Sequence, residues 1–119
     1  MILNEIKEKL QEIDNRVYYG AVDINDVKNS DWNYIVFNRN VTSIVPNKTG
    51  YSDHYTVNVV RENFVPVGTD NEIIKKMLEI AGMRLASADI NYIYVVKPNT
   101  NKVVEMMTIE FVKARKANV

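Results

Sequence analysis

The stretch Lys102–Lys113 (KVVEMMTIEFVK) and the stretch before it, Ile90–Lys97 (INYIYVVK), are the strongest strand segments of the chain. Both are dense in β-branched and aromatic residues, which suit a pleated, partly buried surface. The residues between them, Pro98–Asn101, form an obvious turn, so the two segments are predicted to pair as a hairpin. Successive side chains of a strand point to opposite faces, and in this hairpin both faces are partly apolar.

A second hairpin is predicted upstream, from Trp32–Arg39 (WNYIVFNR) and Tyr51–Arg61 (YSDHYTVNVVR). The later segment alternates between an apolar and a polar row of side chains. The apolar row is Tyr51, Tyr55, Val57 and Val59, and the polar row is His54, Thr56 and Asn58. This alternation is expected where one face of a sheet packs on a core and the other face meets water.

The segment that joins these two strands, residues 38–50, exceeds the two to five residues usual for a hairpin loop. It carries Val41, Ile44 and Val45 among polar residues. Two interpretations follow from this pattern. The segment lies over the core as a cover, which is the more ordinary outcome for a loop, or it extends the hairpin as a β-arm that contacts a partner.

The N-terminal segment is predicted to be an amphipathic helix over about residues 2–14. Its apolar residues are spaced three or four apart, and this stripe is expected to pack on a sheet of the same domain. The stripe is Leu3, Ile6, Leu10 and Ile13. A short strand at Val17–Tyr19 follows the helix.

A second helix is predicted to begin at Thr69–Glu72 (TDNE). This pattern indicates a capping box, in which the Thr69 hydroxyl accepts from the Glu72 amide while the Glu72 side chain reaches back. The apolar stripe that follows continues the helix to about Ala86, despite Gly82.

These elements predict an α+β fold in one domain that spans residues 1–119. The expected architecture is an antiparallel or mixed β-sheet with two helices packed on it, in the order α-β-β-β-α-β-β. No internal repeat or linker divides the chain.

The composition argues against several functional classes. Fifteen basic and fifteen acidic residues cancel, so no net field attracts nucleic acid or an anionic membrane. The absence of cysteine removes disulfides, thiolate metal sites and thiol chemistry, which fits a reducing cytosol. The charged N-terminus does not resemble a signal peptide, and no apolar run approaches the length of a membrane span.

The stretch 23–31 is polar and is predicted to be a loop. Its acidic residues do not have the spacing of a calcium-binding EF-hand loop, so no calcium site is expected there.

No catalytic, cofactor or metal site is predicted. His54 is the only histidine, and the adjacent Asp53 points to the opposite face of the strand, so the two cannot form a local acid–base pair. We expect a surface histidine. Glu105 and Glu110 also fall on opposite faces of one strand, and the four glycines are isolated from any phosphate-binding pattern.

A central capped segment, Thr69–Leu85 (TDNEIIKKMLEIAGMRL), leads to a terminal hairpin that ends in Val103–Arg115 (VVEMMTIEFVKAR). With this order of elements, the chain resembles the tail terminator or tail-completion proteins of tailed bacteriophages and phage-tail-like bacteriocins. The resemblance covers nearly the whole chain, and it rests on length, element order and pattern. It implies a non-enzymatic structural protein, without a cofactor, that forms a ring, usually of six copies, on the head-proximal end of the tail tube. The implied location is the virion tail or neck, after assembly in the bacterial cytoplasm.

The resemblance implies that the partners are further copies of the chain and the tail tube protein, with the sheath and the head–tail connector as further candidates. A ring requires contacts in which one surface meets a different surface of the next copy. We expect these contacts on the 39–50 segment and on the basic C-terminal end, although a solvated terminus is the ordinary interpretation of that end. The expected contact residues are Arg39, Val41, Ile44, Val45, Lys48, Lys113, Arg115 and Lys116. The alternatives are another neck or connector protein, and a small ligand-binding or enzymatic α+β domain.

Overall fold

The computed structural model describes residues 2–22, 31–44 and 50–116. These residues form two helices and a six-stranded mixed sheet, which confirms the predicted α+β class. The order is α1 (Ile2–Gln11), β1 (Val17–Tyr19), β2 (Tyr34–Ile44), β3 (Gly50–Glu62), α3 (Thr69–Met77), β4 (Met83–Leu85), β5 (Asn91–Val96) and β6 (Val103–Lys116). The predicted loop at 23–31 lies outside the described residues, apart from Asp31.

Both predicted hairpins are present in the sheet. β2 pairs with β3, β5 pairs with β6, and both pairings are antiparallel. The strand order is β1-β2-β3-β6-β4. On the same edge of β6, β5 pairs with residues 103–108 and β4 pairs with residues 111–113. The short strand β1 joins the edge of β2 in parallel, which makes the sheet mixed. β3 and β6, which are far apart in sequence, form the central ladder.

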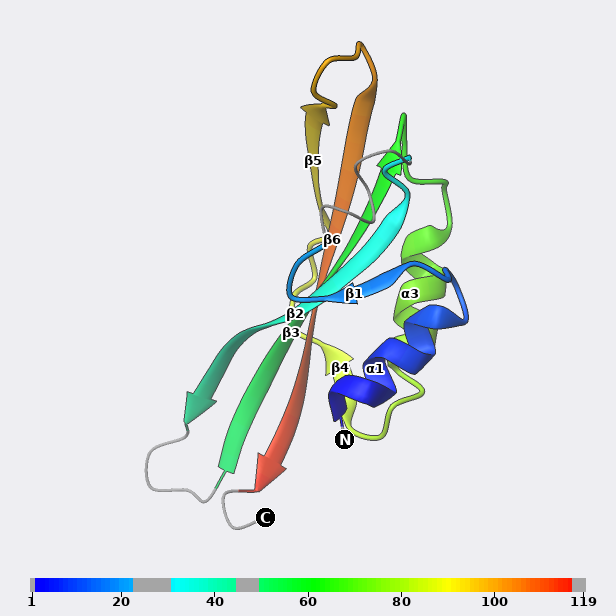
Figure 1. Ribbon diagram of the computed structural model, residues 1–119. Helices are drawn as coiled ribbons and strands as arrows, with labels where there is room; N and C mark the ends of the chain where they lie inside the picture. Colours follow the sequence, from blue (N-terminus) through cyan, green and yellow to red (C-terminus); the bar gives the residue numbers. More distant parts are fainter. Residues whose placement is uncertain (1, 23–30, 45–49, 117–119) are drawn as a thin grey trace.

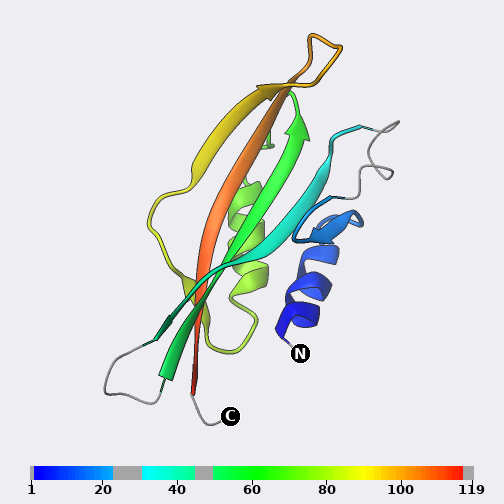
Figure 2. The ribbon, with the colours of Figure 1, turned by 60° about the vertical axis from the view of Figure 1, so that its left-hand side comes forward.

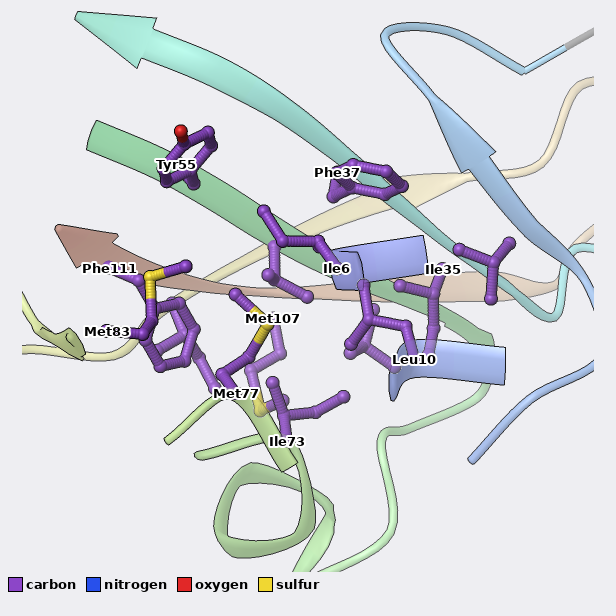
Figure 3. Close-up of a cluster of buried hydrophobic side chains, with 14 of the residues drawn as sticks. Ile6, Leu10, Ile35, Phe37, Tyr55, Ile73, Met77, Met83, Met107 and Phe111 are labelled. Atoms are coloured by element: carbon purple, nitrogen blue, oxygen red, sulfur yellow. The ribbon is translucent and has the colours of Figure 1, made fainter. Parts of the chain in front are cut away.

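The two helices lie on the same side of the sheet (Figures 1 and 2). Their buried side chains, Ile6 and Leu10 from α1 and Ile73 and Met77 from α3, meet the apolar rows of the central strands (Figure 3). The sheet side of this core includes Phe37, Tyr55, Val57, Val59, Met107, Ile109 and Phe111. No described helix covers the opposite side of the sheet, which we call the open face.

The first helix ends sooner than the predicted residue 14. Its last regular residue is Gln11, and the amides of Ile13 and Asp14 then both bond to the carbonyl of Leu10. The Asp14 carboxylate accepts from the amide of Arg16 at 2.9 Å. This side-chain turn competes with the helix for the backbone, as aspartate commonly does.

The predicted capping box and the predicted end of the second helix are both wrong. Gly68 occupies the cap position with φ 99°, and no side chain caps the helix. The Glu72 amide instead bonds to the carbonyl of Gly68, and a left-handed φ of this kind is accessible mainly to glycine. The helix stops at Met77, because a series of turns then leads to Gly82 at φ 81°, which redirects the chain into β4.

Replacing Phe111 by alanine should lower the free energy of unfolding by about 3–5 kcal/mol. The Phe111 ring is fully buried at the centre of the core. Phe64→Ala is the matched control, because the same side chain is 64% exposed there, and it should change stability by less than about 1 kcal/mol. Urea denaturation followed by circular dichroism measures both values. Equal losses in the two variants would contradict this location of the core.

Candidate interaction surfaces

The sheet extends past the layer of helices at the end where β2, β3 and β6 run side by side (Figure 1). We call these strand ends, Arg39–Ile44, Gly50–Asp53 and Lys113–Lys116, the arm. Across the arm Ile44 is opposite Tyr51, and Tyr51 is opposite Arg115. The register of β2 on β3 shifts between Arg39 and Thr42, and irregularities of this kind bend and twist a strand.

The arm decides between the two interpretations of the long connection. Residues 38–44 continue the hairpin as a strand instead of covering the core, so the cover interpretation is wrong for them. The C-terminal end is also not a free terminus as far as Lys116, because Lys113–Lys116 pairs with β3. Both corrections have one cause, since the backbone groups of the three segments satisfy one another in a ladder.

The structure brings six of the eight predicted contact residues to this one end of the molecule. Arg39, Val41 and Ile44 lie on β2, and Lys113, Arg115 and Lys116 lie on β6. β3 lies between the two groups, so they are separated by roughly 10 Å across the sheet. Val45 and Lys48 lie outside the described residues.

The arm is held in shape by a cluster around Asp53. Its carboxylate accepts from the Thr42 hydroxyl at 2.8 Å and from Nε of Arg115 at 2.6 Å. The Arg115 guanidinium also lies 4.4 Å from the centre of the Tyr51 ring. Burial raises the pKa of Asp53, but the bonds from Arg115 and Thr42 outweigh it, so the pKa lies below its usual value. Arg115 was predicted as a contact residue, and the structure also gives it this internal role.

The remaining contact residues leave apolar and basic surface exposed. Val41 and Ile44 are exposed apolar residues, and Lys116 is exposed at the end of β6. The Arg39 side chain donates to the Tyr19 hydroxyl at 3.1 Å. Between the arm and the start of α1 there is a hollow of about 200 Å³, which Arg39, Thr42 and Asp53 help to line. The described part of the arm therefore offers exposed apolar residues together with an excess of basic residues.

The sequence did not single out β5 as a surface. Each of its six residues is exposed, although the segment NYIYVV carries no charge. β6 occupies one edge of β5, and no described strand occupies the other edge. The sequence did contain a sign of this surface, because both faces of the Ile90–Lys113 hairpin are partly apolar. What could not be foreseen is that neither face of β5 would be covered by a described helix.

A hollow of about 380 Å³ lies on the helix side of β5, and we call it the β5 hollow. The chain segment that leads into α3 supplies Phe64, Val67 and Asp70, while the strands supply Tyr92, Tyr94 and Glu105. Glu105 is buried and accepts from the amide of Val65 at 2.6 Å. Tyr94 also bonds to Glu105, and this bond raises the pKa of Tyr94.

On the open face the polar row of β3 meets polar residues of β6. The Thr108 hydroxyl donates to the Asn58 amide oxygen at 2.8 Å. His54 is half-buried, not freely exposed, and its Nδ1 lies 3.8 Å from a carboxylate oxygen of Glu110. Sequence spacing excluded Asp53 as a partner for His54, but it could not reveal Glu110, which comes from the neighbouring strand.

Replacing Asp53 by asparagine should lower the free energy of unfolding by about 1–2 kcal/mol at pH 7. The loss is no larger because Arg115 is half exposed, and water screens its attraction to Asp53. The pKa of Asp53 in the folded state is lower than in the unfolded state. Its contribution is therefore present above about pH 4 and is lost as the pH falls through the folded-state pKa.

Denaturation curves of wild type and the Asp53→Asn variant from pH 7 to pH 2.5 measure this difference. The matched control is Asp89→Asn, because Asp89 is exposed in the connection between β4 and β5 and should change stability by no more than about 0.5 kcal/mol. A difference between wild type and Asp53→Asn that stays constant over the whole pH range would contradict the role of the charge.

No protein-family model matches the chain, and no curated protein matches it. Within the described ranges 2–22, 31–44 and 50–116, no helix is long and apolar enough to cross a membrane. The same ranges contain no group of three histidine, aspartate or glutamate side chains that could hold a metal ion.

Proposed function

We propose that this protein is a tail terminator of a tailed bacteriophage or of a phage-tail-like bacteriocin. In this role, copies of the chain form a ring, with six as the expected number, that caps the head-proximal end of the tail tube. The resemblance of Thr69–Leu85 and Val103–Arg115 supports the assignment. The ring would be part of the virion, assembled in the bacterial cytoplasm, with the tail tube protein and the head–tail connector as its neighbours.

The observation that carries the proposal is that the sheet is longer than its layer of helices. The molecule measures 53 × 28 × 25 Å, and its radius of gyration is 15.6 Å, whereas a compact chain of this length would have about 13.5 Å. The two ends therefore project with exposed apolar residues, Val41 and Ile44 at one end and β5 at the other. Contiguous exposed apolar surface is typical of interaction sites.

The two projecting ends differ from each other, which supports a ring. The arm consists of the ends of β2, β3 and β6 and has an excess of basic residues. The other end consists of the uncharged edge strand β5 and the β5 hollow beside it. Contacts between unlike surfaces are heterologous, and they close into a ring when the rotation per copy allows it. A protein with one self-complementary patch would instead form a dimer.

We assign no enzyme activity or cofactor to the protein. On the open face, His54 Nδ1 and a carboxylate oxygen of Glu110 are separated by 3.8 Å, which is longer than the roughly 2.6–3.2 Å of a hydrogen bond. The specific observation that favours a different function is the β5 hollow, whose tyrosines and carboxylate could contact a small ligand. A saturable rise in melting temperature with one compound class in a thermal-shift screen would favour that alternative.

Light scattering on the purified protein should give the mass of a ring. Six copies of the 13.7 kDa chain amount to about 82 kDa. Negative-stain images with isolated tail tubes should show a cap on one tube end. A strict monomer at high concentration that does not bind tubes would refute the proposed function. Rings that attach to the head connector but never to tubes would favour another neck protein.

Reversing the charge of Arg39 and Lys48 to glutamate should impair ring assembly and tube capping, because electrostatic complementarity governs association more than folding. The double variant should keep the circular dichroism spectrum of wild type. The matched control is Lys7→Glu with Lys75→Glu, which reverses two exposed charges on the helices. Normal assembly of a folded Arg39→Glu, Lys48→Glu protein would exclude the 39–50 segment as a contact surface.

A further inference from the structure

The β5 hollow has apolar walls without a covering element. Val67 is fully exposed, and Phe64, Tyr92 and Tyr94 are also exposed. Aromatic side chains that stand beside an unpaired strand edge are a typical anchor for a partner, because their burial gains free energy at small entropic cost. An apolar strand edge that stays open is also a site of unwanted aggregation, so proteins normally cover it. The hollow is therefore expected to have an occupant.

The charge of the hollow restricts the occupant. Asp70 stands at its rim and Glu105 at its base, and none of the described residues that line it is basic. Glu105 is buried, and it bonds to the Val65 amide and to the Tyr94 side chain. An occupant with an apolar tip and flanking cationic groups fits these walls best.

The arm has these properties. Val41 and Ile44 supply exposed apolar surface, with 68% of Ile44 accessible. The arm contains four basic residues against one carboxylate, which is Asp53. The basic residues are Arg39, Lys113, Arg115 and Lys116. The arm and the hollow are thus complementary both in apolar character and in charge.

The arm cannot reach the hollow of its own chain. Glu105 and Arg115 lie on the same strand, β6, ten residues apart, which corresponds to roughly 34 Å of rigid strand. Figure 1 shows β5 and the arm at opposite ends of the molecule. A contact between them therefore joins two copies, and it joins unlike surfaces, as a ring requires.

We propose that the arm of one copy docks in the β5 hollow of the next copy. The Ile44 side chain packs against Phe64, Val67 and Tyr92, while the basic residues of the arm face Asp70 and Glu105. This inference rests on the proposed ring and names the contact that builds it.

Cysteine pairing tests the contact directly, because the chain contains no cysteine. Ile44→Cys and Val67→Cys are prepared as separate proteins, mixed under assembly conditions and treated with a short bismaleimide. Both positions are exposed, so neither change should disturb folding. The mixture should give cross-linked dimer in at least tenfold excess over either variant alone, because each single variant lacks the second thiol. Lys7→Cys mixed with Val67→Cys is the matched control, and it should give only background.

The outcomes separate this inference from the proposed function. In one outcome, rings form normally but the mixture of Ile44→Cys and Val67→Cys cross-links no more than the control. This outcome would overturn the docking and leave the ring intact. Efficient cross-linking of Val67→Cys with itself would also overturn it, since that result shows β5 edges meeting each other. A protein that stays monomeric at high concentration would remove the ring and the docking together.

Discussion

The ladder between β3 and β6 is the interaction on which the rest of the structure depends. It runs from Gly50 opposite Lys116 to Glu62 opposite Val104 without a shift in register. Because side chains alternate in a strand, a slip of one residue would turn Val57 and Ile109 from the core to the open face. The ladder therefore fixes both the helix side of the sheet and the relative positions of the two hairpins.

The length of this ladder has a geometric consequence. Fourteen residues in β6 span roughly 46 Å, whereas the ten and nine residues of α1 and α3 each span about 15 Å or less. Helices of this size cover only the middle of such a strand. The ends of the sheet must therefore be stabilised by other means, and both ends use charged groups.

At the arm Asp53 joins β2 to β6 through Thr42 and Arg115. At the other end the Glu62 carboxylate accepts from Lys97 at 2.8 Å and from the amide of Trp32 at 3.2 Å, which ties neighbouring strands together. These bonds hold the strands in place, but they bury little apolar surface. Apolar residues near them, such as Ile44 and Val96, stay exposed, and the proposed contact between copies uses this exposed surface.

The sequence by itself determined the fold class, both hairpins, the first helix stripe and the alternation of the strand faces, because these depend on local periodicity. It also located the 39–50 segment and the basic end as contact candidates. It also located the start of α3 at Thr69, but not how the helix is capped or where it ends. Both of these depend on Gly68 and Gly82, whose left-handed backbone conformations follow from where the helix joins the sheet. Only the tertiary structure decided that Arg39–Ile44 and Lys113–Lys116 form one arm, because this depends on the ladder between β3 and β6, whose paired residues are more than forty positions apart. Only the tertiary structure decided that β5 stays uncovered, because this depends on helices too short to cover the whole length of that ladder.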